Sequence, residues 1–551
     1  MTKAQKKRHD HKYIFVIGGV MSGVGKGIST ASIGTILQAM GHDVNLMKID
    51  PYLNVDAGNM NPTEHGEVFV MDSGLETDQD MGNYERFLNR DLTNVDYVTS
   101  GMVYREVIES ERNLEYGGRC VEAIPDVRDN IIARLERSGQ VNKSDVTIVE
   151  IGGTIGDYQN ALFMEAARVM HVKHRHDVVF ILVSYLPIPS KLGEMKTRPT
   201  QNALRQLNSY GIQADFIIAR SAVPLDQKRK DKLASTCSVE ADHVISAPDI
   251  DSIYDVPLNF EKDKIGEMLA HDLGLPNRKP KLDEWRKFVR KVNNGGKTVK
   301  IAIVGKYFDT GDFTLADAYI SVIEAIKFST YHEGLKPELH WVNAKKFENN
   351  PRAVKELVQY DGIIVPGGFG EKGIEGKIAV IKYAREKKIP YFGLCYGMQL
   401  MTIEYARHVA GLKGANTAEI DKEAPHLVID IMEDQKEKLL KKNYGGSMRL
   451  GAYPCYLKGG TIARKAYGHD VISERHRHRY EVNPAYIEQL EDAGLVFSGT
   501  SKDGVLMEIA ELPQSKHPFM LGTQFHPEFK ARPLSPHPLF SAFIKAAGKK
   551  K

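Results

Sequence analysis

The sequence predicts an α/β protein with two doubly wound domains, each a sheet of mainly parallel strands with helices on both faces. Three observations support this prediction. Short apolar runs alternate with helix-like segments in both halves of the chain, which is typical of parallel strands joined by crossover helices. The 551 residues exceed what one hydrophobic core ordinarily serves. A segment rich in lysine and arginine, residues 276–297, separates the two alternating stretches.

The chain is therefore expected to divide into a first domain of residues 1–275, a linker of residues 276–297 and a second domain of residues 298–551. Inside the linker, apolar side chains recur at helical spacing, so part of it should pack as a helix. These side chains are Leu282, Trp285, Phe288, Val289 and Val292.

The composition excludes several classes of protein. The net charge of +3, from 74 basic and 71 acidic side chains, gives no basic excess of the kind that nucleic-acid-binding proteins carry. No apolar run approaches the ~20 residues of a membrane span, and the basic residues 3–8 are typical of a solvated tail rather than a signal peptide. The four cysteines form no Cys-x-x-Cys pair, which favours a reducing cytoplasm without disulfides or structural zinc.

Six apolar runs are the expected strands of the first domain: residues 13–17, 44–49, 146–151, 178–183, 216–219 and 244–247. Helical patterns lie between them, for example at residues 126–137 and 160–170. Ligands of such sheets bind at the carboxyl ends of the strands, so the polar residues that follow each run are the candidate site residues.

The first of these polar stretches is a glycine-rich loop. Residues 18–28 read Gly-Gly-Val-Met-Ser-Gly-Val-Gly-Lys-Gly-Ile between the first strand and a helix expected at residues 29–40. Backbone N–H groups in such a loop cradle phosphates, and Lys26 supplies a full positive charge. The usual phosphate loop has glycine at position 20 and a hydroxyl at position 27. This chain has Val20 and Gly27, so carboxylates elsewhere must bind more of the metal.

Carboxylates follow the next strands. Glu150 ends the third predicted strand, and Asp80 lies in an acidic loop at residues 76–80. Two oxygen ligands facing a triphosphate suit Mg²⁺, which keeps several waters and bridges phosphates. The sequence therefore predicts that Glu150 and one of the acids of this loop bind Mg²⁺. For Asp80 alone, a solvated acidic loop is about equally compatible with the pattern.

A second polar cluster spans residues 191–201. Pro199 suits the first turn of a helix, and Thr200 and Gln201 would present donors at its N-terminus. Three cations around this turn would suit a second anionic ligand, although charged loops are common in α/β proteins.

The second domain is expected to begin with strands at residues 299–304, 362–365 and 391–394. The third is followed by Gly-x-Cys-x-Gly, a nucleophile elbow with Cys395 in place of serine. The helix that follows would favour the thiolate and supply N–H groups to an oxyanion. His526 and Glu528 offer a base and an orienting carboxylate. Residues 367–370, Gly-Gly-Phe-Gly, could complete the oxyanion hole.

The alternative to a catalytic triad is a buried cysteine with an unrelated His-Pro-Glu at the surface. Three matches in a fixed order favour the triad. The charged run at residues 474–480 leaves two interpretations open: a strand that recognises a carboxylate, or a solvated face.

With these motifs in order, the chain resembles the CTP synthase family, and its second half resembles the class I glutamine amidotransferases. Matching stretches include Lys-Ile-Asp-Pro-Tyr at residues 48–52, Glu-Thr-Asp-Gln-Asp at 76–80, Lys-Thr-Arg-Pro-Thr-Gln at 196–201 and Arg-His-Arg-His-Arg-Tyr at 475–480. The resemblance runs from residue 12 to about residue 548. It implies a synthetase domain and a glutaminase domain that together use ATP, glutamine and Mg²⁺ to aminate UTP to CTP.

The resemblance also implies which residues bind each ligand. ATP would contact Gly23, Val24, Gly25, Lys26, Gly27, Ile28 and Asp80, with Lys48 nearby. Asp80 and Glu150 would hold Mg²⁺. UTP would contact Ser22, Lys196, Thr197, Arg198, Pro199, Thr200, Gln201 and Lys232. Product CTP would contact Asp157, Tyr158 and Gln159. Glutamine would contact Gly368, Tyr396, Gly397, Met398, Gln399, Glu419 and Arg479.

Regulation and assembly are implied in the same way: GTP as activator, CTP as feedback inhibitor, and a homotetramer. Three places depart from the family pattern. Residues 156–159 read Gly-Asp-Tyr-Gln where Gly-Asp-Ile-Glu is common, so an amide replaces a carboxylate at the CTP position. Tyr396 stands where leucine is common, and residues 307–318 form a longer segment near the region of GTP activation.

Two alternative functions are compatible with parts of this pattern. One is another amidoligase, such as an enzyme like a cobyrinic acid amidase, with a related phosphate loop and glutaminase. The other is a switch ATPase whose second half senses glutamine without hydrolysing it. The Lys-Thr-Arg-Pro-Thr-Gln stretch argues against the first, and an intact nucleophile, base and carboxylate argue against the second.

Overall fold

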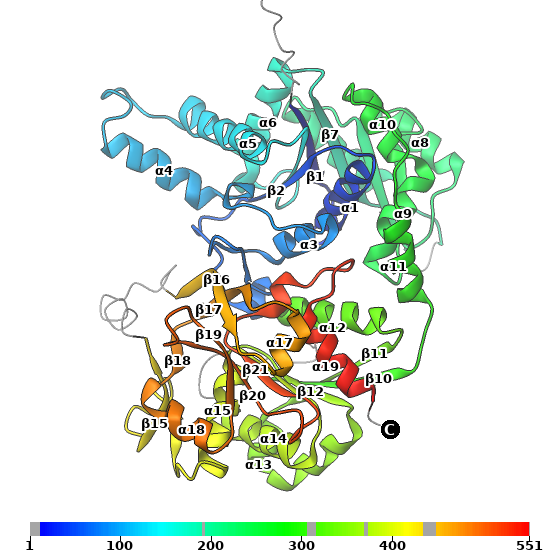
Figure 1. The fold of residues 1–551 in the computed structure, drawn as a ribbon. Coiled ribbons are helices and arrows are strands. Elements are labelled where there is room, and N and C mark those ends of the chain that lie inside the picture. The colour runs from blue at the N-terminus through cyan, green and yellow to red at the C-terminus, as the bar shows by residue number, and fades with distance from the viewer. Residues whose placement is uncertain (1–10, 190–192, 306–315, 369–372, 433–447, 550–551) are drawn as a thin grey trace, which may run out of the picture. The chain divides into compact units, whose positions relative to one another are not determined.

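The computed structural model describes residues 11–189, 193–305, 316–368, 373–432 and 448–549 (Figure 1). Among these residues, none of the helices combines the length and the apolar character that a membrane crossing requires. The chain forms two compact units, and each contains a β-sheet covered by helices and has its own hydrophobic core.

The division into compact units differs in two places from the contiguous division expected from the sequence. The first unit contains Met1–Asp56 and Asn83–Val289, and the second contains Ala57–Gly82 and Arg290–Lys551. Residues 57–82 thus pack with the second half of the chain. Much of the predicted linker packs with the first half. The reason is that both segments carry apolar side chains, such as Phe69 and Trp285, that are buried in those units.

The first unit holds a seven-stranded parallel sheet in the order β5-β2-β6-β1-β7-β8-β9. Its strands are β1 (Lys12–Gly18), β2 (Val44–Asp50), β5 (Tyr97–Thr99), β6 (Val146–Ile151), β7 (Val178–Tyr185), β8 (Phe216–Ser221) and β9 (Val244–Pro248). The six predicted strands are confirmed. The short edge strand β5 was not predicted, because three residues carry too little periodicity.

Most residues of these strands are buried, which matches continuous apolar runs covered by helices on both faces. The main helices of this unit are α1 (Lys26–Ala39), α4 (Ser100–Arg112), α5 (Arg128–Asn142), α6 (Ala161–Lys173), α7 (Arg198–Ser209), α8 (Gln227–Cys237), α9 (Val256–Phe260) and α10 (Ile265–Asp272). Helix α3 (Gln79–Leu88) begins in the segment assigned to the second unit and ends in the first.

The strand order determines where ligands of the first unit can bind. Strand β1 is central, and β6 and β7 pair with it on either side in parallel register. The loops after these three strands therefore meet at one edge of the sheet, where the order reverses. The predicted phosphate loop and Glu150 both lie at this edge.

The predicted linker contains helix α11 (Asp283–Asn293). Trp285, Phe288 and Val289 are buried, as their helical spacing predicts. The Trp285 indole N–H donates to the Tyr254 carbonyl at 2.8 Å. This segment is therefore an ordered helix rather than a free connection.

The second unit holds a nine-stranded mixed sheet in the order β11-β10-β12-β13-β21-β20-β19-β16-β17. Its strands are β10 (Thr298–Gly305), β11 (Lys336–Asn343), β12 (Gly362–Val365), β13 (Tyr391–Leu394), β16 (Arg449–Leu457), β17 (Val471–His478), β19 (Val496–Thr500), β20 (Met507–Glu511) and β21 (Met520–Thr523). The three predicted strands, now β10, β12 and β13, are confirmed in the parallel half. The antiparallel extension through β20, β19, β16 and β17 was not predicted.

Helices cover this second sheet (Figure 1). They are α12 (Ile320–His332), α13 (Lys345–Asn349), α14 (Ile374–Lys387), α15 (Tyr396–His408), α17 (Ile462–Tyr467), α18 (Ile487–Asp492) and α19 (Pro538–Gly548). A small sheet contains β14 (Ala415–Thr417), β15 (His426–Ile431) and β18 (Tyr480–Val482). Residues 57–82 contribute the short helix α2 (Pro62–His65) and a hairpin of β3 (Phe69–Val70) and β4 (Glu76–Thr77).

Candidate active site

The glycine-rich loop joins β1 to α1 as predicted. The predicted ATP residues Gly23, Val24, Gly25, Lys26, Gly27 and Ile28 lie in this loop and in the first turn of α1. Gly23 and Gly25 have φ of 70° and 90°, a left-handed conformation that glycine adopts without strain. Val20 stands where the usual motif has glycine, and its φ is 78°. A β-branched residue rarely adopts this conformation, and such strain is concentrated at functional sites.

Lys26 lies at the start of α1 and is only 8% exposed. Its Nζ donates to the Gly153 carbonyl at 2.8 Å, which ties the phosphate loop to the loop after β6. A Cβ on Gly18 would lie 2.8 Å from this Nζ, so a glycine at position 18 leaves room for the lysine side chain. The ammonium is therefore held beside the exposed loop, at the N-terminus of a helix, where a phosphate is stabilised.

Glu150 is buried at the end of β6 and is surrounded by hydrogen-bond donors. Its Oε1 accepts from Lys48 Nζ at 2.8 Å, and its Oε2 accepts from the Tyr84 hydroxyl. A carboxylate at the carboxyl edge of this sheet fits Mg²⁺ bound to nucleotide phosphates, since that ion needs one or two protein carboxylates. The described residues hold no cluster of three or more His, Cys, Asp or Glu side chains that could form a complete metal cage.

Asp80 lies in the first turn of α3, in the part of that helix that belongs to the second unit. Its joint role with Glu150 stays a prediction, because the two residues belong to different units.

The predicted UTP stretch lies at the start of α7, and Pro199 occupies its first turn as expected. Lys196 Nζ donates to Glu194 at 2.6 Å. Lys196 lowers the pKa of the Glu194 carboxyl, and Lys232 on α8 contributes to the same shift. The structure thus brings Lys196 and Lys232 to one acidic side chain.

Other predicted UTP residues differ in exposure. Thr200 is fully buried and accepts a hydrogen bond from the Ser184 hydroxyl at 2.8 Å, so its side chain serves the fold. Gln201 Nε2 donates to the Thr197 hydroxyl at 3.2 Å. Ser22 and Arg198 are exposed at the loop and at the start of the helix, where a ligand could reach them.

The predicted CTP residues form a turn after β6. Asp157 Oδ2 accepts from the Thr154 N–H at 2.7 Å, which fixes the turn. Tyr158 is 98% exposed, and Gln159 is also exposed. Their side chains are thus open to a ligand, whereas the Asp157 carboxylate already has a structural partner.

In the second unit, Cys395 lies between β13 and α15 with φ 49° and ψ −99°. This strained geometry is the predicted nucleophile elbow, and the glycines of the motif permit it. A Cβ on Gly393 would lie 2.6 Å from the Gly397 carbonyl carbon, and a Cβ on Gly397 would overlap the Val365 carbonyl oxygen. The sharp turn therefore needs glycine on both sides of the cysteine.

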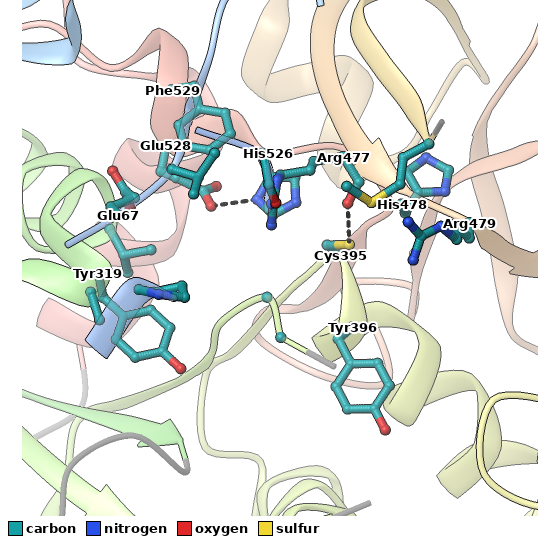
Figure 2. Close-up of a pocket in the computed structure, with 18 of the residues that line it drawn as sticks. Glu67, Tyr319, Cys395, Tyr396, Arg477, His478, Arg479, His526, Glu528 and Phe529 are labelled. Carbon is teal, nitrogen blue, oxygen red and sulfur yellow. Dashed lines mark hydrogen bonds and ion pairs between the residues drawn. The ribbon is translucent and has the colours of Figure 1, made fainter. Parts of the chain in front are cut away.

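The predicted triad residues Cys395, His526 and Glu528 line the same cavity (Figure 2). His526 Nδ1 and Glu528 Oε1 are 2.7 Å apart, while His526 Nε2 makes no hydrogen bond to any of the described residues. A Cβ on Gly367 would lie 2.8 Å from His526 Cε1 and 3.7 Å from Cys395 Cβ, so both side chains face this glycine. Burial lowers the pKa of His526, but the negative charges of Glu528 and of the Cys395 thiolate raise it to about 10.

Two further groups contact the sulfur. Cys395 Sγ donates to the Arg477 carbonyl at 3.8 Å, and Gln524 Nε2 donates to Sγ at 3.6 Å. Gln524 is fully buried. Neither residue was predicted as a partner of the nucleophile, because the two contacts join segments that are 82 and 129 positions apart in the sequence.

The triad opens into a cavity of about 380 Å³ (Figure 2). Five predicted glutamine residues line it: Gly368, Tyr396, Gln399, Glu419 and Arg479. Gly397 and Met398 do not line it, because they are packed inside α15. Of the predicted oxyanion-hole stretch, Gly367 and Gly368 line the cavity, and Phe369 and Gly370 lie outside the described residues.

Glu419 and Arg479 place one carboxylate and one guanidinium in the same cavity as the thiol. Such a pair complements the ammonium and carboxylate groups of a free amino acid, since a planar guanidinium suits a carboxylate. The cavity therefore suits a small zwitterion with a side chain directed at Cys395.

The charged run at residues 474–480 forms the end of β17 and the start of β18. Arg475 and His476 are fully buried, and Arg477 and Arg479 line the cavity. The interpretation as a solvated face is therefore wrong. Burial lowers the pKa of His476 and His478 far below its usual value, and Arg449 adds to this effect.

Sequence reasoning missed the residues that the 57–82 segment contributes to the cavity. They are Gly58, Asn59, Pro62, Glu67 and Val68. Glu67 accepts from the Ser321 N–H at the start of α12, at 3.2 and 3.3 Å. No local signal could assign this segment to the glutaminase side, since its partners lie more than 250 positions further along the chain.

Comparison with known proteins gives a family for both halves. A CTP synthase N-terminus model matches residues 12–275, and a class I glutamine amidotransferase model matches residues 314–546. A curated CTP synthase of Thermococcus gammatolerans is 48% identical over 98% of this chain and 99% of its own length. The chain belongs to the CTP synthase family.

Other members of the CTP synthase family are about as similar. The CTP synthase of Thermococcus kodakarensis is 49% identical over 98% of this chain and 99% of its own length. The solved glutaminase domain of a Trypanosoma brucei CTP synthase, with bound acivicin, is 39% identical. That match covers 46% of this chain and 95% of that domain, with a TM-score of 0.42. Because the full-length relatives match both halves in order, the comparisons favour a CTP synthase over other amidoligases.

Proposed function

We propose that this chain catalyses the ATP-dependent amination of UTP to CTP with ammonia released from glutamine. The observation that carries the proposal is the joint presence, in one CTP synthase family chain, of two sites. One is a strained phosphate loop with buried Lys26, and the other is a Cys395–His526–Glu528 elbow that opens into a cavity with Glu419 and Arg479.

In the glutaminase site, the Cys395 thiolate attacks the side-chain amide carbon of glutamine. The S–C bond forms, the C–N bond breaks, and His526 donates its proton to the departing ammonia. Glu528 orients the imidazole through Nδ1, at 2.7 Å. Water, deprotonated by His526, then hydrolyses the γ-glutamyl thioester to glutamate. Glu419 would hold the substrate ammonium, and Arg479 its carboxylate.

In the synthetase site, the phosphate loop would hold ATP, and Lys26 would stabilise the charge of the γ-phosphoryl group as it moves to O4 of UTP. Ammonia then adds at C4, and phosphate leaves. Ser22, the residues from Lys196 to Gln201, and Lys232 would bind UTP. Asp80 and Glu150 would hold Mg²⁺, which neutralises phosphate charge when bound.

The proposal also covers the regulation of the protein and its assembly. GTP would activate the glutaminase, and the protein would act as a cytoplasmic homotetramer. Product CTP would bind at Asp157, Tyr158 and Gln159. Gln159 cannot supply the carboxylate that is common in the family, so we expect CTP inhibition to be weaker here. A titration of CTP into the assay below measures that strength.

A steady-state assay tests the proposed function directly. The purified protein is incubated with UTP, ATP, Mg²⁺ and glutamine, and nucleotides and glutamate are separated and quantified. We expect CTP and glutamate to form in equal amounts, with little CTP when ATP is withheld. Glutamate formation without CTP, for any uridine nucleotide supplied, would contradict the proposal and favour a different acceptor.

A further inference from the structure

The triad of the second unit is supported by a segment that is remote in sequence. Ala57–Gly82 forms the β3–β4 hairpin and packs in the same compact unit as Cys395, His526 and Glu528. None of its residues belongs to the triad. Three separate contacts nevertheless connect this segment to the groups that hold the triad in place.

The first contact runs through Arg477. Its guanidinium donates to Glu76 at 2.8 Å and to the Gly58 carbonyl at 3.2 Å. Its backbone carbonyl accepts from Cys395 Sγ at 3.8 Å. Glu76 is 2% exposed, and a buried charged hydrogen bond fixes geometry more strongly than a solvated one. Glu76 therefore holds the residue whose carbonyl touches the nucleophile.

The second contact runs through Arg475, two residues earlier on β17. Its side chain is fully buried, forms an ion pair with Asp72 and donates to the Val70 carbonyl at 3.1 Å. Its backbone carbonyl accepts from the His526 N–H at 2.8 Å. Because residues i and i+2 of a strand face the same way, both arginines reach the hairpin while their carbonyls reach the triad.

The third contact is aromatic. The Phe529 ring stacks on the His526 imidazole, with centroids 5.1 Å apart and an interplanar angle of 18°. Phe69 of β3 packs edge-on against Phe529 at 5.1 Å. The base is thus held at its backbone through Arg475 and at its ring through Phe529, and both supports end on the hairpin.

The hairpin itself is held rigidly. The Ala452 N–H of β16 donates to the Asp72 carbonyl at 2.9 Å. Gly451 and Gly74 approach so closely that a Cβ on Gly451 would lie 2.6 Å from the Gly74 nitrogen. Lys530, one residue after Phe529, also donates to Asp72 at 3.2 Å. The contacts therefore form a connected frame rather than isolated surface pairs.

We propose that Asp72 and Glu76 are positioning residues of the glutaminase reaction, which fix the Cys395 and His526 geometry through the carbonyls of β17. Neither is among the described residues that line the cavity. This inference rests on the proposed glutaminase function. It adds that the active site of the second half is complete only with a segment encoded in the first half.

The test uses full-length Asp72→Asn and Glu76→Gln, which remove a charge and keep the side-chain shape. A misplacement of about 1 Å in a reacting group can cost about a hundredfold in rate. We therefore expect kcat for glutamine hydrolysis to fall at least tenfold, with KM within threefold of the parent. Ammonium-dependent CTP formation by Asp72→Asn should stay within twofold, because its synthetase half is untouched.

A second readout does not depend on substrate. In a Cys120→Ser background, which removes the exposed cysteine, the rate of Cys395 alkylation by iodoacetamide is measured between pH 5 and 9. A well-placed imidazolium gives a reactive thiolate at low pH. We expect the variants to lose most of this low-pH reactivity, so that their profile moves toward that of an unassisted thiol.

The matched control is Glu375→Gln, which removes an ion pair with Arg407 at 2.9 Å in the same unit, away from β17. It should change neither readout. Parent-like kcat and alkylation in Asp72→Asn and Glu76→Gln would overturn the proposal, as would an equal loss in Glu375→Gln. If the parent fails to hydrolyse glutamine, the proposed function falls, and the alkylation profile alone still decides whether the hairpin positions the thiol.

Discussion

Lys26 and Cys395 occupy the same kind of position in two different sheets. Each lies at the N-terminus of a helix that follows a parallel strand, α1 after β1 and α15 after β13. The positive end of a helix stabilises a phosphate in one case and a thiolate or oxyanion in the other. Both residues are nearly buried, so these charges interact in a medium that screens them less than water does.

The role of the nucleophile predicts the effect of Cys395→Ala. This variant should lose glutamine-dependent CTP formation by at least about 10³-fold, because no thioester can form. With added ammonium it should form CTP at the parent rate, since the synthetase site is intact. Parallel assays with glutamine and with ammonium chloride provide the measurement. Loss of both activities together would contradict the division into two sites.

The role of the phosphate-loop lysine predicts a different pattern for Lys26→Ala. CTP formation should fall by at least about 10²-fold with either nitrogen source, because the charge beside the transferring phosphate is lost. The control is Lys12→Ala, which removes a mostly buried lysine paired with Asp177 at the opposite end of β1. Glutamine hydrolysis without nucleotides should persist in both variants. Full CTP formation by Lys26→Ala would exclude the proposed role of this lysine.

At the scale of elements, the strand-turn-helix around Cys395 can form only because glycines on both sides of the cysteine let neighbouring backbone segments come into direct contact. Gly393 lies against the Gly397 carbonyl carbon, and Gly397 lies against the Val365 carbonyl. Close backbone contact keeps β12, β13 and α15 in register and gives Cys395 its strained φ of 49°. The packing around the turn offsets the energetic cost of this backbone conformation.

A single methyl group should therefore disturb this element. Gly397→Ala should destabilise the second unit by about 1–3 kcal/mol, the usual cost of overpacking a core, and lower glutaminase activity more than tenfold. The control is Gly459→Ala, at a glycine with no atom within 4 Å of an added Cβ. Urea unfolding and glutamine hydrolysis measure the two effects. Equal stability of both variants would show that the close approach at Gly397 is unimportant.

At the scale of the whole molecule, acid stability depends on histidines that fold in the neutral form. His517 donates from Nε2 to the Ala384 carbonyl at 3.2 Å and accepts from the Phe519 N–H at 3.3 Å. Burial lowers the pKa of His517 from 6.5 to about 4. The unfolded chain binds a proton more readily than the folded chain between these values. The contribution of neutral His517 to the free energy of unfolding is therefore complete above about pH 6.5 and is lost as the pH falls through 4.

The linkage gives a measurable difference. Between pH 7 and pH 5, His517 should account for about 2 kcal/mol of lost unfolding free energy, from 1.36 kcal/mol per pKa unit. A His517→Asn variant should be less stable at pH 7 but should lose about that much less on acidification. Urea titrations of parent and variant at the two pH values give the unfolding free energies whose differences are compared. An identical acid loss in parent and variant would assign the effect to other groups.

Local sequence patterns determine many of the elements of this protein and most of its catalytic motifs. The six predicted strands of the first sheet, the phosphate loop, the nucleophile elbow and its His-Pro-Glu partner are each encoded within a few consecutive residues, where periodicity and glycine placement act directly. Tertiary structure alone decided the rest. The antiparallel half of the second sheet, and the unit with which the predicted linker helix packs, depend on contacts between distant parts of the chain.

The hairpin of residues 57–82 is the clearest case. By their position in the sequence these residues continue the first domain, and their carboxylates suggest either a Mg²⁺ ligand or a solvated acidic loop. In the folded chain, Glu76 meets Arg477 across 401 positions, and Asp72 meets Arg475 across 403. A sequence motif shows which charged groups and carbonyls a segment contains. Which of them form ion pairs and hydrogen bonds depends on burial and on distances in the folded chain. Only the fold could therefore assign this segment to the glutaminase site.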